Sequence, residues 1–384
     1  MNPGNFHLVV VDSDDLVRAF LDFPSTLYKS DKNWIRPLDR EIEKVFDPLK
    51  NPIFISGGAI RWLLYDSTNR VAGRIGAFYD RSTISKYAQP TGGIGFFDCI
   101  NNEEAAHALF DAGKTWLAEN GMEAMDGPVN WGDRNSFWGC LSFGFHEPVY
   151  NKPYNAPYYP RLFESYGFKN HFKQYTYHLA FQRDPKFIII KARTNRLLKD
   201  PGYRFEILNR NNNNNFEAEV IALYKKVWSG VPGISHIIEE QANTWFNSLK
   251  PILNKHAVMF AYYNNEPIAF SIMIPDMNQV IRKFNGKLNG FNKLRLFFQL
   301  KMQKKCTRLI GLVLGVIPEY RDKGIESALL ARFENEMRKK RYRYSDLELN
   351  CIGDFNPPMI AMFEHLGGEI FKTYITYRYL FKQP

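Results

Sequence analysis

The order of apolar and polar residues predicts short strands and helices along the whole chain. Alternating runs predict strands, and apolar residues three and four positions apart predict helices. In the first half these patterns predict a hairpin at 59–80, a strand at 92–100, a helix at 102–121, a strand at 122–130, a short helix at 158–168 and a strand at 173–181. Gly121 and Gly167 stand where the two helices should end.

The second half repeats this order of elements. Its patterns predict a strand at 203–210, helices at 216–228 and 237–253, a hairpin at 257–274, a strand at 307–318, a helix at 325–340, a strand at 345–352, a helix at 356–367 and a strand at 369–381. The repeated order indicates an internal duplication. We predict an α/β (α+β) protein with domains at 1–182 and 203–384, joined by a helical linker at 183–202.

The composition is typical of a globular protein with two domains. The chain has 384 residues, of which 45% are hydrophobic and 23% charged. No apolar run approaches the roughly 20 residues that span a membrane, and the N-terminus lacks the basic start and apolar core of a secretory signal. The four cysteines form no CxxC pair and have no histidines nearby, so we expect neither a metal site nor a disulfide framework. These features predict a cytoplasmic protein.

A strongly basic segment interrupts the second half before the predicted strand at 307–318. The net charge of the chain is +10, and residues 279–308 hold nine Lys or Arg and no acidic residue. Apolar residues recur at helical spacing within this insert, which we place at 277–306. Such a helix can bind an anionic membrane or a nucleic acid backbone, or it can cover a substrate cleft while its lysines stay in water. We favour the third interpretation and keep nucleic acid as an alternative partner.

A second unusual segment, residues 127–168, places many Trp, Tyr and Phe among Asn, Asp, Arg and Gly. A long segment of this composition is typical of the wall of a binding site. The same aromatic residues could instead fill an interface between the two halves, and the two uses are compatible.

The stretch GVIPEYRDKGIESALLARFENEMRKK, residues 315–340, leads from an apolar strand through a charged turn into an amphipathic helix. Such a turn presents backbone N–H groups at a helix N-terminus, and these groups favour an anion such as phosphate. Gly324 would let a ligand approach the backbone, and Arg321 and Lys323 add positive charge. The spacing also fits an ordinary strand-to-helix turn with a solvated charge cluster. The phosphate-binding patterns GxxxxGK[ST] and GxGxxG are both absent from the sequence.

The segment VIPEYRDKGIESALL resembles motif A of the GNAT superfamily of acyl-CoA-dependent N-acyltransferases, whose pattern is V-x-P-x-x-[RQ]-x-x-G-x-[GA]. Val316, Pro318, Arg321 and Gly324 match this pattern. The resemblance extends over the second half and implies a mixed, mostly antiparallel sheet flanked by helices. It further implies that the strand before the turn splays from its neighbour, and that the cofactor is acetyl-CoA or another acyl-CoA bound in the gap.

In this resemblance the CoA pyrophosphate lies on the backbone amides of residues 321–326. The implied cofactor-binding residues are Leu314, Gly315, Val316, Arg321, Asp322, Lys323, Gly324, Ile325, Glu326 and Asn356. The first half is similar in the order of its elements only. Its strand at 92–100 leads through NNEE into a helix without Arg-x-x-Gly, and the acidic residues there would repel a pyrophosphate. We therefore predict a degenerate GNAT-like first half that binds no CoA.

The chain departs from the family pattern at two positions. Glu326 stands where the family has Gly or Ala, and a carboxylate there disfavours a nearby pyrophosphate unless it turns away or pairs with Arg321 or Lys323. Phe363 stands where many members carry a Tyr that protonates the departing thiolate, and Phe has no proton to donate.

Acyl transfer from a thioester to an amine requires a polarised carbonyl, a base for the ammonium proton and an acid for the thiolate. Backbone N–H groups near 314–316 are candidates for the first task. Glu348 is the candidate base, and Tyr374 and Tyr377 on the last strand are candidate acids. Alternatively, Glu348 pairs with a surface Lys or Arg, and the two tyrosines are only packed.

These features predict an N-acyltransferase that transfers an acetyl or other acyl group from CoA to a small-molecule or peptide amine. Two alternatives remain open. One is an aminoacyl-tRNA-dependent transferase, because tandem GNAT-like halves also occur in such peptidoglycan enzymes. The other is a non-catalytic CoA-binding or interaction protein. Glu326 and Phe363 favour the alternatives, and Arg321 and Gly324 favour the CoA-dependent enzyme.

Overall fold

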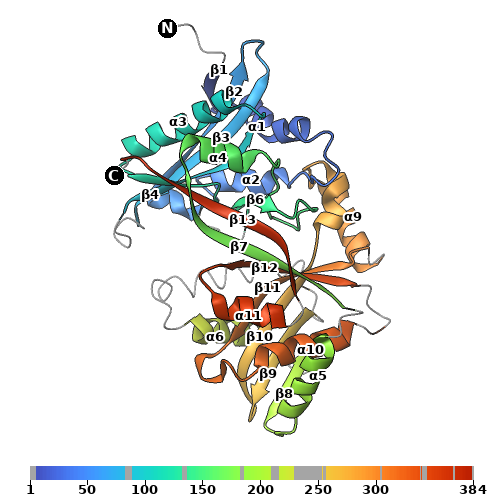
Figure 1. The fold of residues 1–384 in the computed structure, drawn as a ribbon. Helices are drawn as coiled ribbons and strands as arrows, with labels where there is room; N and C mark the ends of the chain where they lie inside the picture. Colours follow the sequence, from blue (N-terminus) through green and yellow to red (C-terminus); the bar gives the residue numbers. More distant parts are fainter. Residues whose placement is uncertain are drawn as a thin grey trace.

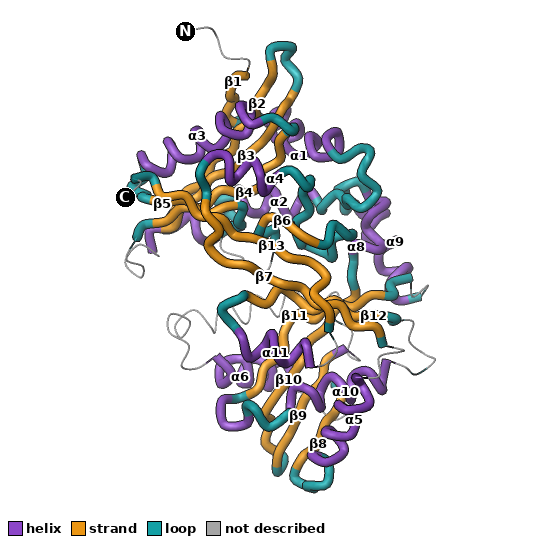
Figure 2. The backbone as a smooth tube through the Cα atoms, viewed as in Figure 1, coloured by secondary structure: helices purple, strands orange, loops and turns teal. Residues whose placement is uncertain are grey.

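The strands of both halves join in one large sheet, with helices packed on it (Figures 1 and 2). The structure is a computed structural model that describes residues 6–82, 89–131, 136–181, 186–208, 216–228, 253, 257–302, 305–337, 339, 344–365 and 368–382. The sheet has 13 strands in the order β1-β2-β3-β4-β5-β13-β7-β12-β11-β10-β9-β8, and β6 pairs with β13 beside this path. Only β4–β5 and β11–β12 are parallel pairs among the described strands. This architecture confirms the predicted α/β class with a mixed, mostly antiparallel sheet.

The first half contains the helices and strands that the sequence pattern predicts. The pattern did not predict the strand, two α-helices and 3-10 helix that precede them, nor the short strand at Cys140–Phe143. The bounds of all these elements are β1 (Phe6–Val10), α1 (Asp14–Leu27), α2 (Asp39–Phe46), η1 (Pro52–Ile55), β2 (Gly57–Asp66), β3 (Val71–Asp80), β4 (Thr91–Cys99), α3 (Glu103–Glu119), β5 (Ala124–Gly127), β6 (Cys140–Phe143), α4 (Tyr159–Tyr166) and β7 (Lys169–Ala180). The Asn102 side chain accepts from the Ala105 amide at 2.9 Å and caps α3. Gly167, with φ +106°, ends α4 as predicted.

The second half follows its predicted order closely. The bounds are α5 (Lys186–Leu197), β8 (Tyr203–Ile207), α6 (Phe216–Trp228), β9 (Val258–Tyr263), β10 (Glu266–Pro275), α8 (Asn278–Ile281), η4 (Arg282–Phe284), α9 (Gly290–Lys301), β11 (Arg308–Val316), η5 (Pro318–Tyr320), α10 (Ile325–Met337), β12 (Asp346–Gly353), α11 (Pro357–His365) and β13 (Glu369–Leu380). Residues 237–252 of the second predicted helix lie outside the described residues. The predicted linker at 183–202 contains α5, which packs beside α10 (Figure 1).

The last strands of the two halves are exchanged. β13, at the end of the chain, pairs with β5 of the first half through Tyr377 opposite Gly127. β7, at the end of the first half, pairs with β12 of the second half through His178 opposite Glu348. Since β7 and β13 also pair with each other, they form the centre of the continuous sheet. Each half therefore completes its sheet with a strand from the other half.

Helices cover both faces of the sheet in each half, and the larger apolar core of each half lies on the face that α10 or α3 covers. In the second half, α10 buries Ile325, Leu329 and Phe333 against the sheet. In the first half, α3 buries Leu109 and Phe110 against β3 and β4. Burying a side chain of this size stabilises the fold by about 1.5–3 kcal/mol. These two cores hold the halves as packed layers around the exchanged strands.

The aromatic segment at 127–168 contributes to the contact between the two halves, which is one of the two uses that its composition suggested. None of its described residues lines the cavity of the second half between β11 and β12. Tyr159 is buried in the first-half core. The Tyr150 amide donates to Asp276 at 3.0 Å, and Pro148 accepts from the Asn278 amide group at 2.8 Å, so the segment also contacts the second half. None of the helices in the described part of the chain is long and apolar enough to cross a membrane.

Candidate functional site

The parallel strands β11 and β12 separate at the level of the predicted site. They pair at Arg308–Asp346 through Gly311–Leu349, and none of the described residues of β12 pairs with β11 beyond that point. On its other side β11 stays paired with β10 as far as Val316. The predicted splay of the strand before the turn is therefore present, and it leaves one strand edge with backbone groups facing a gap.

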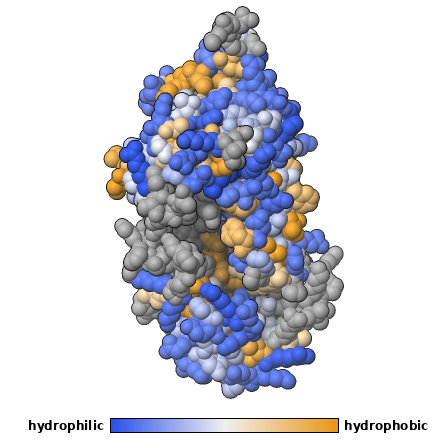
Figure 3. All heavy atoms as spheres, turned by 60° about the vertical axis from the view of Figure 1, so that its left-hand side comes forward, coloured by the Kyte–Doolittle hydropathy of each residue, from blue (hydrophilic) through white to orange (hydrophobic). Residues whose placement is uncertain are grey.

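This gap contains a cavity of about 260 Å³. It is lined by Gln174, Ser271, Met273, Gly311, Leu312, Val313, Leu314, Leu330, Leu349, Asn350, Cys351, Ile352, Gly353, Phe355, Asn356, Met359 and Phe363. The space-filling view of the side that carries α6 and α11 shows a hollow with hydrophobic residues at mid-height (Figure 3). Mostly apolar walls with a few polar groups are typical of a small-molecule site.

The turn after β11 has the backbone that a phosphate-binding turn needs. Asp322 and Gly324 have φ of +61° and +81°, and α10 begins at Ile325 directly after them. No atom lies within 4 Å of the position that a Cβ on Gly324 would take, so the glycine is required by its backbone conformation and faces open space. Amides at this helix start are thus accessible to a ligand.

Some charged side chains of the turn already contact other groups of the protein. The Arg321 guanidinium donates to the carbonyl oxygens of Val227 at 2.8 Å and Val316 at 3.4 Å, and so joins α6 to the turn. The Lys323 ammonium lies 4.6 Å from the centre of the Tyr320 ring. Burial raises the pKa of Glu326, the Asp322 carboxylate raises it further, and Arg321 opposes the rise. A raised pKa reduces the negative charge that Glu326 would present to a phosphate.

Asn356 and Phe363 both line the cavity, from the start and the end of α11. The Asn356 side chain accepts from the Met359 amide at 3.4 Å and caps the helix. Phe363 is buried and stacks on Tyr177, with 5.8 Å between the ring centres. The ring at the family's tyrosine position therefore faces the gap without a hydroxyl group.

Glu348 lies under the closed end of the gap in a buried ion pair. Both of its carboxylate oxygens accept from the Lys372 ammonium at 2.8 Å, and the two side chains are 1% and 0% exposed. The pairing that the sequence offered as an alternative thus exists, but with a buried lysine of β13 instead of a surface residue. Burial lowers the pKa of Lys372, and the nearby Glu348 carboxylate opposes this effect.

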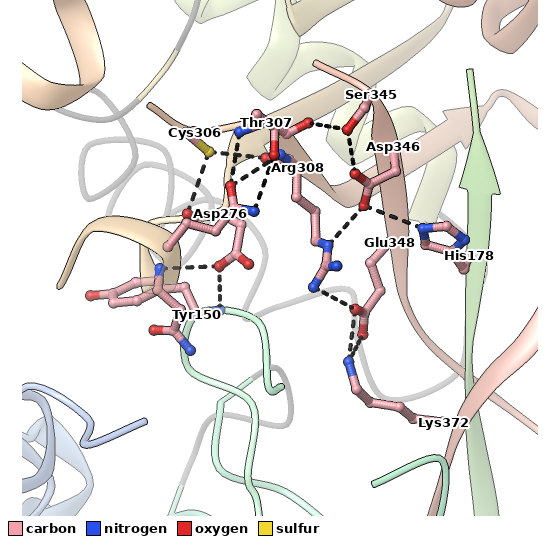
Figure 4. A network of polar contacts seen from close by, with 12 residues as sticks. Tyr150, His178, Asp276, Cys306, Thr307, Arg308, Ser345, Asp346, Glu348 and Lys372 are labelled. Carbon is pink, nitrogen blue, oxygen red and sulfur yellow. Dashed lines mark hydrogen bonds and ion pairs between the residues drawn. The ribbon is translucent and has the colours of Figure 1, made fainter. Parts of the chain in front are cut away.

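The pair belongs to a larger polar network (Figure 4). Arg308 donates to Asp346 at 2.8 Å and lies 4.0 Å from Glu348, and His178 of β7 lies 3.2 Å from Asp346. Burial alone would raise the pKa of Asp346, but hydrogen bonds from His178, Arg308 and Ser345 hold it at about 2. Burial raises the pKa of Asp276, at the end of β10, to about 7.

The two candidate tyrosines occupy different surroundings. Tyr374 is fully buried opposite Gln174, and its hydroxyl has no partner within the described residues. Burial raises the pKa of Tyr374 well above its ordinary value, with further contributions from Cys351 and Glu348. Tyr377 donates to Glu164 of α4 at 2.9 Å and packs in the first-half core. The fold therefore brings Tyr374 near the gap and places Tyr377 away from it.

Among the cavity residues that were not predicted from the sequence, two are buried and polar. Gln174 and Ser271 are buried at 4% and 1% exposure, and each has a side-chain oxygen without a hydrogen-bond partner among the described residues. Ser271 carried a weak signal, because it is the one hydroxyl in the apolar run IAFSIMI. Gln174 carried none, because it reaches the cavity only through the strand exchange. No group of three or more His, Cys, Asp or Glu suited to a metal ion occurs in the part of the chain that the structure describes.

Comparisons with known proteins agree with this geometry. Residues 222–368 match the acetyltransferase (GNAT) family. Protein YghO of Escherichia coli (strain K12) is 27% identical over 376 residues, which cover 96% of this chain and 93% of that protein. A protein named bacterial ceramide synthase, from Caulobacter vibrioides (strain NA1000 / CB15N), is 26% identical over 388 residues, which cover 97% of each chain.

Among solved structures, a tandem GNAT protein from the clavulanic acid biosynthesis pathway superposes with a TM-score of 0.57 over 99% of both chains, at 10% identity. That identity supports a likeness of fold alone. The splayed strands, the matching segment and the shared architecture lead to one conclusion: this chain has the fold of a tandem GNAT protein, and its second half matches the acetyltransferase (GNAT) family over residues 222–368.

Proposed function

We propose that the second half binds an acyl-CoA between β11 and β12 and transfers its acyl group to an amine. The observation that carries this proposal is the separation of the two strands directly above the turn at 321–326. An apolar cavity, an unpaired strand edge and a helix N-terminus occur there in the order in which an acyl-CoA has its acyl thioester, its amide-containing arm and its pyrophosphate. The family match over residues 222–368 supports the same reading.

The turn would hold the pyrophosphate through its backbone. The amides of residues 321–326 and the dipole of α10 favour an anion, and Gly324 leaves room for close approach. Lys323 is exposed and adds a positive charge, whereas Arg321 acts by fixing the turn to α6. The edge of β11 at 312–316, which is not paired with β12, would pair with the amides of the pantetheine arm, and amides near 314–316 would polarise the thioester carbonyl.

Acyl-CoA supplies an activated acyl carbon, and the nitrogen–carbon bond forms as the carbon–sulfur bond breaks. The ammonium loses two protons in all: one is removed before the nitrogen attacks and leaves to solvent, and the second is lost as the amide forms and is balanced by the one that the sulfur gains. We assign the removal of the ammonium proton to Glu348, directly or through water, with Lys372 holding the carboxylate in place. We assign the donated proton to the Tyr374 hydroxyl, which has no other described partner. Tyr377 has no part in this scheme because it bonds to Glu164.

For the acceptor, we propose a long-chain amino alcohol and, as donor, a fatty acyl-CoA. This narrower proposal is supported by the relative that bears the name bacterial ceramide synthase and aligns with 97% of this chain. A ceramide is the amide of such an amine with a fatty acid. The cavity fits apolar substrates, since Leu312, Leu330 and Met359 are among the residues that line it.

Calorimetric titration of acetyl-CoA, palmitoyl-CoA and free CoA tests the first part. We expect the wild type to bind and Gly324→Val to lose at least about tenfold in affinity, because a left-handed backbone with a side chain costs about 1–2 kcal/mol and the new Cβ branch covers the amides. Gly121→Val is the matched control, because Gly121 has φ +84° and an equally open Cβ position in the first half.

Equal binding of all three ligands to the wild type and to Gly324→Val would place CoA elsewhere, and absence of binding would remove the CoA-dependent enzyme altogether. An amine screen with the bound acyl-CoA tests the second part. We expect amide formation with sphinganine and little with spermidine or an amino acid. Preference for the short polar amines would overturn the narrower proposal and leave the broader one.

A further inference from the structure

Helix α9 of the insert presents large apolar side chains to solvent. Five of the 13 exposed large hydrophobic residues in the described part of the chain lie on it or directly after it: Phe291 (73% exposed), Leu294 (69%), Phe297 (59%), Phe298 (46%) and Met302 (69%). Their spacing of three and four positions places them on one face of the helix. In Figure 1, α9 stands at the right-hand edge of the molecule. A concentration of this kind marks an interaction surface.

The opposite face of α9 already fixes the helix to the protein. Leu296 and Leu300 pack against a buried cluster formed by Leu38, Met277, Val280, Ile281 and Phe284. The Asn289 side chain accepts from the Asn292 amide at 2.9 Å and caps the first turn. The inner residues therefore fix the helix to the protein, and none of the five exposed apolar residues belongs to a buried apolar cluster of the described chain. None of the described insert residues at 277–302 and 305–306 lines the β11–β12 cavity, so the insert does not cover it as the sequence had suggested.

The surroundings of this apolar face are positively charged. Lys283, Lys287, Lys293 and Lys305 are exposed, and the segment 279–308 has no acidic residue. Arg282 and Arg308 are paired with Glu147 and Asp346 and so contribute less. An apolar face rimmed by lysines fits an anionic bilayer, in which apolar side chains enter the acyl boundary and lysines reach the headgroups.

Other occupants fit less well. A second copy of this chain would bring two sets of unpaired lysines together across a two-fold axis, where like charges repel. A nucleic acid would use the lysines and could stack on Phe, but it gives no burial to Leu294 and Met302 in the same face. The combination of aliphatic side chains with nearby lysines therefore favours a membrane as the partner of this surface.

We propose that the outer face of α9 is a membrane-docking surface for an anionic bilayer. The insert leaves β10 at Pro275 and returns to β11 at Arg308, and both strands line the cavity through Ser271, Met273 and Leu312. Docking through α9 would hold these strands close to the bilayer. This inference rests on the proposed acyl transfer. If that transfer occurs, the position of the two strands near the bilayer identifies the acceptor as an amine dissolved in the membrane.

Flotation of the full chain with lipid vesicles tests the docking, without CoA. We expect binding to phosphatidylcholine vesicles that contain phosphatidylglycerol and little binding to pure phosphatidylcholine. The double variant Leu294→Glu, Phe298→Glu should lose at least about tenfold in partitioning, because it removes apolar insertion and adds repelled charge. Lys287→Glu and Lys293→Glu should each lose about fivefold or more at low salt and less at high salt.

Matched control variants distinguish docking through α9 from non-specific adsorption of the protein to vesicles. Ile55→Glu removes a hydrophobic residue that is 92% exposed in the first half, and Lys199→Glu reverses an exposed lysine away from the insert. Both should bind vesicles like the wild type, and all variants should keep the wild-type melting temperature. Unchanged vesicle binding by the double variant would overturn the proposal. The proposal would also be overturned if the wild type did not bind vesicles but formed a dimer or a tRNA complex that the double variant abolished.

The docking and the proposed function can fail separately. If CoA binds and vesicles do not, the membrane surface is overturned and the acyltransferase stands. If vesicles bind and no acyl-CoA does, the surface stands and the acyltransferase falls. If both bind but acylation of sphinganine is no faster in vesicles than in detergent micelles, the membrane origin of the acceptor is overturned.

Discussion

Lys372, on the last strand of the chain, holds both carboxylate oxygens of Glu348 at 2.8 Å, and neither side chain is more than 1% exposed. This contact joins β13 to β12 across β7, the strand that lies between them. Removing one partner of a buried ion pair leaves the other charge without compensation, which costs about 3–5 kcal/mol.

Lys372→Met and Glu348→Gln should therefore each lower the free energy of unfolding by roughly this amount, as measured by chemical denaturation. The double variant should be more stable than the sum of the two losses predicts, because it removes both charges. Additive losses would show that the pair is not energetically coupled.

The exchanged strands also predict how the chain behaves when it is divided. A fragment of residues 1–182 lacks β13, the strand that lies between β5 and β7, and a fragment of 183–384 lacks β7. Neither fragment should show a cooperative thermal transition by circular dichroism. The two fragments produced together should copurify as one folded complex. A cooperative transition of residues 1–182 alone would contradict this expectation.

Glu326 should weaken CoA binding if the pyrophosphate lies on the turn. Glu326→Gln removes the carboxylate near the N-terminus of α10. The affinity for free CoA should therefore rise by about two- to fivefold at low salt and by less at high salt. Because the pKa of Glu326 is raised, the wild type should approach the affinity of the variant as the pH falls. Equal affinities at every pH and salt concentration would mean that the pyrophosphate is bound elsewhere.

Tyr374 should affect turnover and not stability. Tyr374→Phe removes a buried hydroxyl that has no described partner, so the melting temperature should not fall. If this hydroxyl protonates the thiolate, kcat should fall by about 10² or more with little change in KM. Tyr177→Phe is the matched control, since Tyr177 is equally buried, lacks a described hydroxyl partner and stacks on Phe363. An equal loss of kcat in both variants would remove Tyr374 from the proposed role.

Asp276 should make stability depend on pH near neutrality. Burial raises its pKa to about 7 from the ordinary 3.8, despite the opposing Tyr150 amide and Arg308. The folded chain therefore holds this proton more tightly than the unfolded chain does. The resulting stabilisation is complete below about pH 4 and is lost as the pH rises through about 7.

Asp276→Asn keeps an oxygen for the two backbone donors and removes this titration. Relative to the variant, the wild type should lose on the order of 2 kcal/mol between about pH 5 and about pH 8. Asp346→Asn is the control, since the pKa of Asp346 is about 2 and its titration lies below this window. A pH-independent difference between wild type and Asp276→Asn would exclude the buried carboxyl as the cause.

The sequence by itself determined the features that depend on neighbouring residues. The periodicity placed the helices and strands, and Val316, Pro318, Arg321 and Gly324 located the strand, the turn and the helix start, because their spacing directly encodes local backbone geometry. The same pattern showed an apolar face on Leu294, Phe297, Phe298 and Met302. It could not show which side of that helix faces the protein.

Only the tertiary structure decided the features that depend on distant strands. An alternating pattern specifies a strand but not its neighbour, and consecutive strands usually pair, so β7 and β13 were assigned to their own halves. Their exchange brings Gln174 to the cavity and Tyr377 to Glu164, and it places β7 between the strands of Lys372 and Glu348. The surroundings of each candidate catalytic residue were set by strands whose positions no local pattern encodes.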